Sequence, residues 1–400
     1  MKKTIFSLLV FIGILPNIQG QLKWNPNKRC YIDESTQDCT YNNLLTAVPF
    51  LQITPDSRSG AMGNAGVALS PDANSMHHNS ANLAFIDQDL TIALSYTPWL
   101  RALGIDDINL SYLSVTKRID KLSTAGVALR FFSLGSIDFT DDTGQSLGTG
   151  RPREFDITGA YARKLSDNFS ASFAAKFIYS NLANGQTVGG QEVNAGKSVA
   201  VDLGVTYKTP ISLAGRKHNL TIGASATDLG SKISYVKGYS DFLPANLGVG
   251  AALDYNLDAY NILTFTVDFN KYLVPTPQLD STAANYDPNF RDKPLLSGIF
   301  GSFTDAQGGF TEELQEIMIS TGLEYWYDRQ FAIRLGYFYE NNLKGGRQFL
   351  TMGVGLKYRE YNMDFSYLVP TGYFRSPLTN TLRFGLMFNF GDANDNAKRN

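Results

Sequence analysis

Apolar and polar residues alternate along most of this chain, most clearly near its C-terminus. Leu382, Phe384, Leu386, Phe388 and Phe390 alternate there with arginine, glycine, methionine and asparagine. Successive side chains of a β-strand lie on opposite faces, so this period of two predicts strands with one apolar face. We predict strands near residues 91–97, 107–117, 123–133, 154–164, 168–180, 198–208, 218–228, 245–257, 261–271, 317–327, 331–339, 350–358, 361–367 and 382–390.

The connections between these strands alternate between long and short. The long ones are 98–106, 134–153, 181–197, 229–244, 272–315, 340–347 and 368–380, and the short ones are 119–122, 165–167, 209–217, 258–260, 328–330 and 359. Outer-membrane barrels have even strand numbers, short periplasmic turns and long outer loops. We therefore expect periplasmic termini and surface-exposed long loops, although 209–217 is long for a tight turn.

A soluble sandwich or propeller would also alternate, so the pattern alone leaves that fold open. The chain contains 21 Tyr, 26 Phe and 36 Gly, and it is 18% charged, which suits a barrel that is apolar outside and polar inside. A closed barrel also leaves no strand edge unpaired in lipid. We predict an all-β, 14-stranded antiparallel transmembrane β-barrel over residues 89–391, followed by a periplasmic tail at 392–400.

The first twenty residues have the pattern of a secretory signal peptide. Lys2 and Lys3 precede an apolar run from Ile5 to Leu15, and Gly20 is a small residue before the expected cleavage point. The alternative, an uncleaved anchor helix, needs about 20 apolar residues. We predict export to the outer membrane of a bacterium.

The chain has two cysteines, Cys30 and Cys39, just after the expected cleavage point. In an oxidising compartment we expect them to form a disulfide, and the alternative, a metal site, lacks a nearby histidine. His77 and His78 are adjacent, so their side chains point apart, and we expect no metal and no cofactor. The third histidine, His218, completes no catalytic arrangement, and the net charge of −2 gives no support to a nucleic-acid partner.

Several charged residues fall at predicted inward positions: Asp156, Lys176, Asp202, Asp254, Asp268, Glu324, Arg334, Lys357, Asp364 and Arg383. Isolated charges facing lipid would be costly, so these residues must line a wet or plugged lumen. They could form a conduction path or pair with one another. Because both signs are present, we favour ion pairing.

Residues 21–88 do not alternate as the strands do. Their apolar pieces argue against a flexible periplasmic tail, so we predict an N-terminal hatch, or plug, inside the barrel. Gly60, Gly63 and Gly66 would then permit tight bends or close backbone packing.

The segment from Val48 to Ala68, VPFLQITPDSRSGAMGNAGVA, resembles the hatch of the PorV family of the type IX secretion system. Arg58, Gly60, Met62, Gly63 and Gly66 lie in this motif, and Asn79 opens a second element, NSANLA. Residues 130–137, RFFSLGSI, are also similar. Ser80 replaces the usual proline of an Asn-Pro-Ala element. The resemblance extends over nearly the whole mature chain, and it implies a fourteen-stranded barrel with a hatch, as in long-chain fatty acid transporter-like proteins.

This resemblance implies a non-catalytic carrier. Its partners would be a Sov-type translocon pore, cargo proteins with the type IX C-terminal domain, and a PorU-type sortase with the other attachment-complex proteins, all in contact with outer-membrane lipid. The alternatives are a channel for fatty acids or other small hydrophobic solutes, and a structural scaffold similar to PorQ.

Binding of cargo at the cell surface requires exposed apolar anchors on the outer loops. In the 272–315 loop, five residues fall at helical spacing and form one stripe: Leu295, Leu296, Ile299, Phe300 and Phe303. A second helix is predicted to begin at Thr311. The stripe could contact a partner or pack down on the barrel mouth, and these roles do not exclude each other.

Overall fold

The computed structural model describes residues 22–25, 30–33, 42–101, 104–140, 143–183, 185–188, 191–278, 286–287, 289–371 and 381–392. The chain divides into two units, residues 1–41 and 42–400. In the first, β1 (Leu22–Asn25) pairs with β2 (Cys30–Asp33) in an antiparallel hairpin. The predicted signal peptide, Cys39 with its predicted bond to Cys30, and the tail after residue 392 lie outside the described residues.

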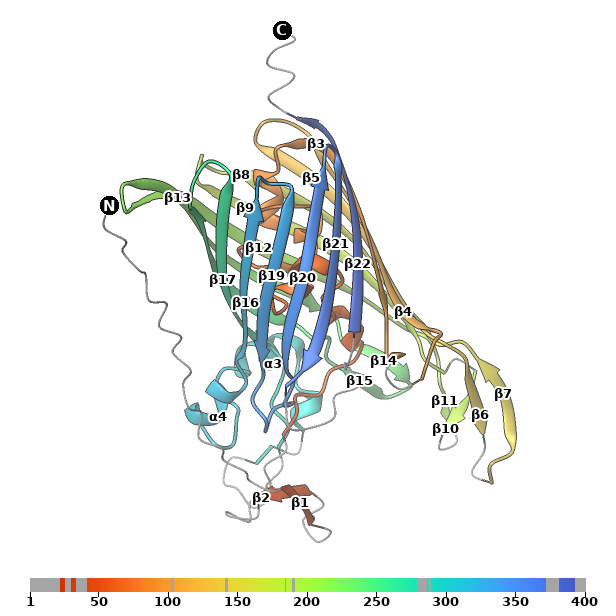
Figure 1. Cartoon of the computed structure of the whole chain (residues 1–400). Coiled ribbons are helices and arrows are strands. Elements are labelled where there is room, and N and C mark those ends of the chain that lie inside the picture. The colour runs from red at the N-terminus through yellow and green to blue at the C-terminus, as the bar shows by residue number, and fades with distance from the viewer. Residues whose placement is uncertain are drawn as a thin grey trace. The chain divides into compact units, whose positions relative to one another are not determined.

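The second unit is a closed antiparallel barrel, which confirms the predicted fold (Figure 1). Each barrel strand pairs with the next one along the chain, and β22 closes on β3. The strands are β3 (Gln88–Pro98), β4 (Ile108–Arg118), β5 (Ser123–Leu134), β8 (Arg153–Lys164), β9 (Phe169–Asn181), β12 (Gly196–Leu213), β13 (Arg216–Gly230), β16 (Asn246–Asn256), β17 (Asn261–Tyr272), β18 (Met318–Tyr327), β19 (Phe331–Tyr339), β20 (Gln348–Tyr358), β21 (Tyr361–Pro370) and β22 (Thr381–Asp392).

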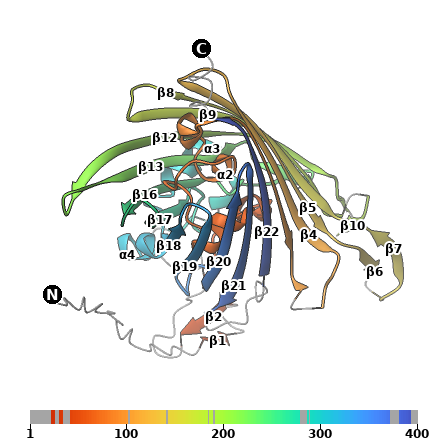
Figure 2. The same cartoon turned by 45° about the horizontal axis from the view of Figure 1, so that its top comes forward.

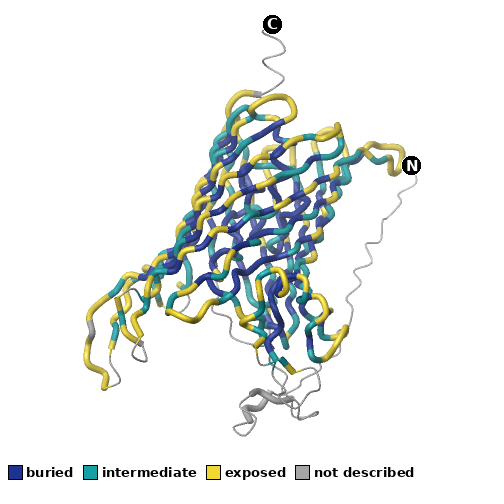
Figure 3. The backbone as a smooth tube through the Cα atoms, turned by 180° about the vertical axis from the view of Figure 1, so that it is seen from behind, coloured by how far each residue is buried: buried dark blue, intermediate teal, exposed yellow. Residues whose placement is uncertain are grey.

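The alternation in sequence becomes an alternation of faces in the barrel wall. In β5, Val127, Leu129 and Phe131 are exposed on the outside, whereas Ala128 and Arg130 between them are buried. Figure 3 shows this exchange of exposed and buried positions along the strands. The outer apolar side chains suit lipid, and the inner ones contact the contents of the lumen. No helix among the described residues is long and apolar enough to cross a membrane.

The long connections gather at one end of the barrel and the short ones at the other (Figure 1). The long connections carry three hairpins, β6 (Ile137–Thr140) with β7 (Ser146–Gly150), β10 (Thr187–Val188) with β11 (Gln191–Glu192), and β14 (Ile233–Val236) with β15 (Tyr239–Asp241). They also carry η4 (Phe290–Asp292), α3 (Leu295–Gly301) and α4 (Phe310–Gln315).

One predicted connection was too long. β12 continues to Leu213 and β13 begins at Arg216, so the 209–217 segment is a hairpin rather than a loop. Ala214 and Gly215 form its turn with φ values of 51° and 75°. Two consecutive positive φ values are typical of the tight turns whose twist matches paired strands.

Residues 48–87 lie within the barrel as short helical pieces joined by turns (Figure 2), and Asn42 and Ala47 before them bond to the long connections at its mouth. These pieces are η1 (Pro49–Gln52), α1 (Ser57–Ala61), α2 (Ser75–His78) and η2 (Ser80–Phe85). Phe50 and Leu51 pack against Ile108, Phe132 and Ile178 of the wall. A second buried cluster joins Met76 and Leu83 to alanines of β5, β8 and β9. Apolar contacts therefore fix this segment at two places on the inner wall.

Candidate functional site

Arg58 connects residues 48–87, which we call the inner segment, to strand β18 of the barrel wall. Its side chain donates to Glu324 of β18 from Nε (3.0 Å) and Nη2 (2.8 Å). Nη1 also donates to the Ser70 carbonyl at 2.9 Å and to Asp72 at 3.2 Å. Paired donation to a buried carboxylate is a strong, directional interaction. Arg58 therefore joins α1 both to β18 and to the Ser70–Asp72 segment that precedes α2.

The motif glycines lie where the inner segment approaches other groups closely. Gly63 has φ +67°, and a Cβ there would lie 2.5 Å from the Tyr337 carbonyl oxygen. A Cβ at Gly60 would meet Arg383 at 2.9 Å, and one at Gly66 would meet the His78 ring at 2.2 Å. The close approach at Gly63 is to backbone, which cannot move aside as a side-chain end can.

Strands β18 and β19 also carry glycines where they meet the inner segment. A Cβ at Gly322 would lie 2.7 Å from the Met62 side chain, and one at Gly336 would lie 2.0 Å from the Gly63 nitrogen. The Gly66 and Val67 amides both donate to Asp268 Oδ2, at 2.6 and 2.8 Å. Backbone therefore packs on backbone here, and one inward carboxylate satisfies two buried amides.

Asn79 joins two parts of the inner segment to the wall. Its Nδ2 donates to the Val67 carbonyl (3.1 Å), the Val205 carbonyl (3.1 Å) and the Thr206 hydroxyl (3.0 Å). Its Oδ1 accepts from the Ala81 amide at 3.1 Å, which caps η2. Ser80, which replaces the proline of the family motif, occupies the first position of η2 and continues this turn.

Among the described residues, six of the ten predicted inward charges form ion pairs, and each pair joins strands that are neighbours, or next but one, along the inner wall. Arg334 donates to Glu324 and to Asp364, each at 2.6 Å, so Arg58, Glu324, Arg334 and Asp364 form one chain of contacts. Lys176 lies 2.5 Å from Asp228 and 3.4 Å from Asp202. Because a buried charge without its partner is costly, these pairs hold the wall charges in place, and Arg58–Glu324 is the pair that joins the inner segment to the wall.

His77 contributes to this polar network. Its Nδ1 lies 3.0 Å from Arg130 Nη2, and Arg130 Nε lies 3.1 Å from Asp156. Across the described ranges, no group of three or more His, Cys, Asp or Glu side chains is arranged to hold a metal ion.

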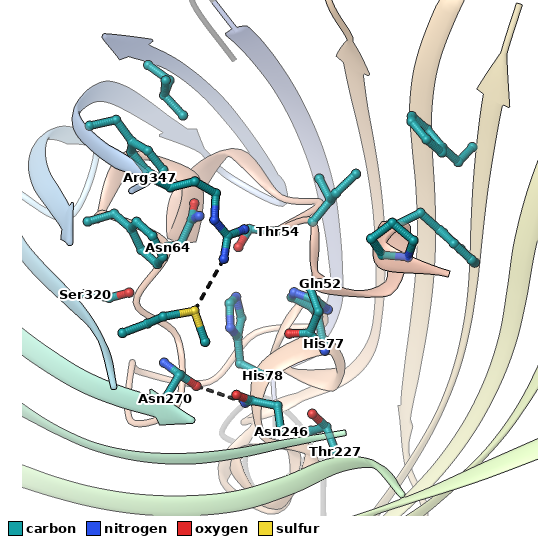
Figure 4. A pocket seen from close by; sticks show the side chains of 18 of the residues that line it. Gln52, Thr54, Asn64, His77, His78, Thr227, Asn246, Asn270, Ser320 and Arg347 are labelled. Carbon is teal, nitrogen blue, oxygen red and sulfur yellow. Dashed lines mark hydrogen bonds between the residues drawn. The ribbon is translucent and has the colours of Figure 1, made fainter. Parts of the chain in front are cut away.

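A cavity of about 520 Å³ lies between the inner segment and the wall, toward the end with the long connections (Figure 4). Its lining is mainly apolar and includes Phe50, Trp99, Phe132, Phe338, Phe349 and Leu368. His77, His78 and Arg347 add polar groups. A mostly apolar cavity with a few polar groups is the usual form of a small-molecule site.

Arg383 lines this cavity and is 2% exposed. Within the described part of the chain, its Nε and Nη1 atoms have no hydrogen-bond partner. A buried guanidinium without an acceptor is costly. Asp56 Oδ2 and His78 Nε2 also lack hydrogen-bond partners among the described residues, and they lie 3.8 Å from each other.

The predicted stripe of the 272–315 loop is divided by α3 between two environments. Ile299 is buried against Ala245 and Leu273 at the barrel mouth, with Leu295 packed beside it. Leu296 and Phe300, by contrast, are 66% and 72% exposed, and Phe303 is 43% exposed. Leu295 and Ile299 therefore pack on the barrel mouth, whereas Leu296, Phe300 and Phe303 face outward and are free to contact a partner.

Two exposed residues of α4 were not among the predicted anchors. Phe310 is 76% exposed and Leu314 is 50% exposed. Their spacing of four residues is a helical signal, but the sequence alone does not say which face of a two-turn helix is covered. We use the term outer patch for Leu296, Phe300, Phe303, Phe310 and Leu314.

Buried ion pairs attach α4 to the barrel mouth. Lys271 of β17 lies 2.9 Å from Glu313 and also contacts Glu316. Lys344 lies 2.5 Å from Glu312 and 2.9 Å from Glu316. Asn42 joins this cluster by donating to Glu312 at 3.0 Å. The outer patch is therefore carried by a fixed platform rather than a free loop.

Comparison with known proteins identifies one matching family. Residues 34–279 match the family model described as type IX secretion system protein PorV. No curated protein matches the chain. Solved structures similar to it include the toluene transporter TbuX of Ralstonia pickettii (12% identity, 84% of this chain and 98% of that one, TM-score 0.47) and a Pseudomonas aeruginosa FadL homologue (10% identity, 84% and 98%, TM-score 0.41).

Proposed function

Because the chain belongs to the PorV family of the type IX secretion system, we propose that it is the outer-membrane carrier of secreted cargo. In this role it binds the C-terminal domain of a cargo protein at a Sov-type translocon pore. It then presents the cargo to the attachment complex, where a PorU-type sortase acts. The carrier itself performs no covalent chemistry, and its long connections face the cell surface.

The observation that supports this proposal best is the outer patch. Five large apolar side chains are exposed on α3, on the turn that follows it and on α4, while Leu295 and Ile299 hold α3 on the barrel mouth. Fixed, exposed aromatic and aliphatic groups serve as anchors in protein interfaces, because little conformational entropy is lost on binding. A folded cargo domain is a partner of suitable size and chemistry.

The proposal also assigns the inner segment the role of a hatch. A carrier of folded domains has no need of an open lumen, and an open one would leak solutes. The Arg58 contacts and the backbone packing at Gly63 support a permanently closed barrel.

The outer patch can be tested with the double variant Leu296→Glu and Phe300→Glu. Each substitution places a charge where an apolar anchor would be covered, and losing two anchors is expected to weaken cargo-domain binding at least 30-fold. The dissociation constant of a purified cargo C-terminal domain would be measured by biolayer interferometry with the detergent-solubilised protein.

Tyr239→Glu is the matched control, because Tyr239 is 72% exposed on the separate β15 hairpin. It should leave the affinity unchanged. Equal affinity of the double variant and the native chain would contradict the assignment of the patch.

Affinity purification of the tagged native chain from envelopes would test the wider role. Recovery of lipid or fatty acid without translocon, sortase or cargo would contradict it.

A second function, a channel or receptor for small hydrophobic solutes, is favoured by the cavity beside Arg383. The apolar lining and the Arg383 Nε and Nη1 atoms that lack an acceptor suit an amphipathic anion. If this function holds, Arg383→Met should reduce the amount of copurified fatty acid at least tenfold while leaving cargo binding unchanged. Mass spectrometry of extracted ligands would measure this, and a native chain free of such ligands would argue against the second function.

A further inference from the structure

At the end of the barrel with the short turns, one hairpin extends beyond its neighbours. β12 pairs with β9 as far as Tyr207, and the last contact is the Lys208 amide with the Asn168 carbonyl at 2.7 Å. Residues 209–213 then pair with β13 alone. We call residues 209–217 the ribbon. Its first strand adds about 16 Å at 3.3 Å per residue.

The ribbon is held firmly at its base. His218 is buried and stacks on Tyr255, with ring centroids 4.1 Å apart. Its Nδ1 accepts from the Asn256 amide at 3.0 Å, so the proton of the neutral ring is on Nε2, which donates to the Leu213 carbonyl at 3.1 Å. Asn256 also donates to the Lys217 carbonyl at 2.8 Å. The projection is therefore a built structure and not a frayed strand end.

The outer face of the ribbon continues the lipid-facing row of the wall. Along β12, Leu203, Val205 and Tyr207 are exposed on the outside of the barrel. Thr209, Ile211 and Leu213 continue this row by the two-residue period of the strand. Thr209 and Ile211 are half-buried and Leu213 is 43% exposed, while Pro210 and Ser212 on the opposite face are exposed. Figures 1 and 3 show the hairpin leaving the wall sideways. A strand pair that bends outward in this way turns the face that continues the outer wall toward the membrane surface.

The charge of the ribbon differs from that of every other short turn. The segment from Lys208 to His218 reads KTPISLAGRKH and contains no acidic residue. The other short turns each contain one, at Asp120, Asp167, Asp258, Asp328 and Glu360. Arg216 and Lys217 are both exposed at the tip. An apolar face bordered by cations is the pattern that binds anionic membrane surfaces.

From this geometry we infer that the ribbon lies on the membrane leaflet at the short-turn end and binds the phosphate groups of anionic phospholipids there. Ile211 and Leu213 enter the interface, while Arg216 and Lys217 contact the headgroups. Continuity with the lipid-facing wall favours lipid over a protein partner. In the proposed orientation this leaflet is the periplasmic one, but the inference does not depend on the secretion role.

The test uses the full chain in vesicles of phosphatidylethanolamine and phosphatidylglycerol (about 3:1), compared with pure phosphatidylcholine. A tryptophan is introduced by Leu213→Trp, and its quenching by lipids brominated in the acyl chains is measured after subtracting the native signal. Ser166→Trp, in an exposed short turn, is the matched control site. We expect at least twofold stronger quenching at position 213, and stronger quenching in the anionic vesicles.

The cations are tested in the Leu213→Trp background with Arg216→Glu and Lys217→Glu. We expect this pair to remove at least half of the quenching in anionic vesicles, whereas Lys121→Glu with Arg359→Glu, which changes the net charge equally, should leave it intact. Heat-modifiable mobility in gels verifies that each variant is folded. Equal quenching at positions 213 and 166, or quenching unaffected by the first pair, would overturn the inference. If residue 213 were exposed to solvent in vesicles but shielded from it in native envelopes, the ribbon would instead bind a protein partner.

Discussion

At the residue scale, the inner segment is positioned by a few groups that tolerate little change. Gly63 combines a positive φ with contact to wall backbone, whereas Arg58 and Asn79 use several donors each. A side chain at a positive φ costs about 1–2 kcal/mol before any steric overlap is added. These motif residues therefore position the inner segment through close packing and hydrogen bonding.

Gly63→Ala should loosen the inner segment without opening the barrel. We expect the free energy of local opening of residues 56–68 to fall by at least about 2 kcal/mol, because strain and a clash with the Tyr337 carbonyl oxygen add together. Hydrogen exchange with mass spectrometry measures this opening. Gly301→Ala, where a Cβ meets open space, should cause no loss. Equal protection in both variants would show that the close approach is unimportant.

At the element scale, α3 and α4 are too short to be stable alone, so the mouth of the barrel fixes them. Ile299 supplies apolar contact for α3, and the cluster of Lys271, Lys344 and three glutamates fixes α4. Burial raises the pKa of Glu312, but the hydrogen bond and the charge of Lys344 outweigh it and hold that pKa below the usual value.

The lowered pKa of Glu312 predicts acid loosening of α4. A carboxyl group whose pKa is lower in the folded state stabilises that state above its unfolded pKa, and this stabilisation is lost as the pH falls through the folded pKa. Protection of residues 310–316 from hydrogen exchange, corrected for intrinsic rates, should therefore fall below about pH 4. Glu312→Gln should lower protection at pH 7 and weaken this pH dependence. An unchanged pH profile would contradict this role of Glu312.

At the scale of the whole molecule, the barrel wall and the inner segment have separate structural roles. Pairing of β22 with β3 leaves no barrel strand with a free edge, so the wall does not depend on the inner segment for its hydrogen bonds. The inner segment occupies much of the lumen, and its Arg58 pairs with the wall carboxylate of Glu324. The two binding surfaces that we propose, the outer patch and the ribbon, lie at opposite rims of this closed wall.

Deletion of residues 42–86 should therefore give a folded barrel that conducts ions. We expect stable conductance steps in planar lipid bilayers for the deletion variant and none for the native chain, because the charged inner wall would become hydrated. The variant with Leu296→Glu and Phe300→Glu, which leaves the lumen unchanged, should also be silent. Native-chain conductance equal to that of the deletion variant would rule out a hatch role.

The alternating pattern of the chain was sufficient to predict the wall of the barrel. Each strand was predicted to within a few residues, apart from the extended β12–β13 hairpin, because lipid outside and a polar lumen inside impose a local period of two. The fourteen-stranded barrel and the family followed from this period and from the motif at residues 48–68. The exposed Phe310 and Leu314 were missed, because the pattern of a short helix does not reveal which side its neighbours cover.

Tertiary structure alone decided which charges pair and which apolar residues remain exposed. Arg58 meets Glu324 across 266 positions of sequence, and Leu295 is covered while Leu296 is not. The extent of the ribbon likewise depends on where β9 stops pairing with β12. These features depend on register and on contacts between distant segments, whereas alternation depends only on the two environments on either side of each strand.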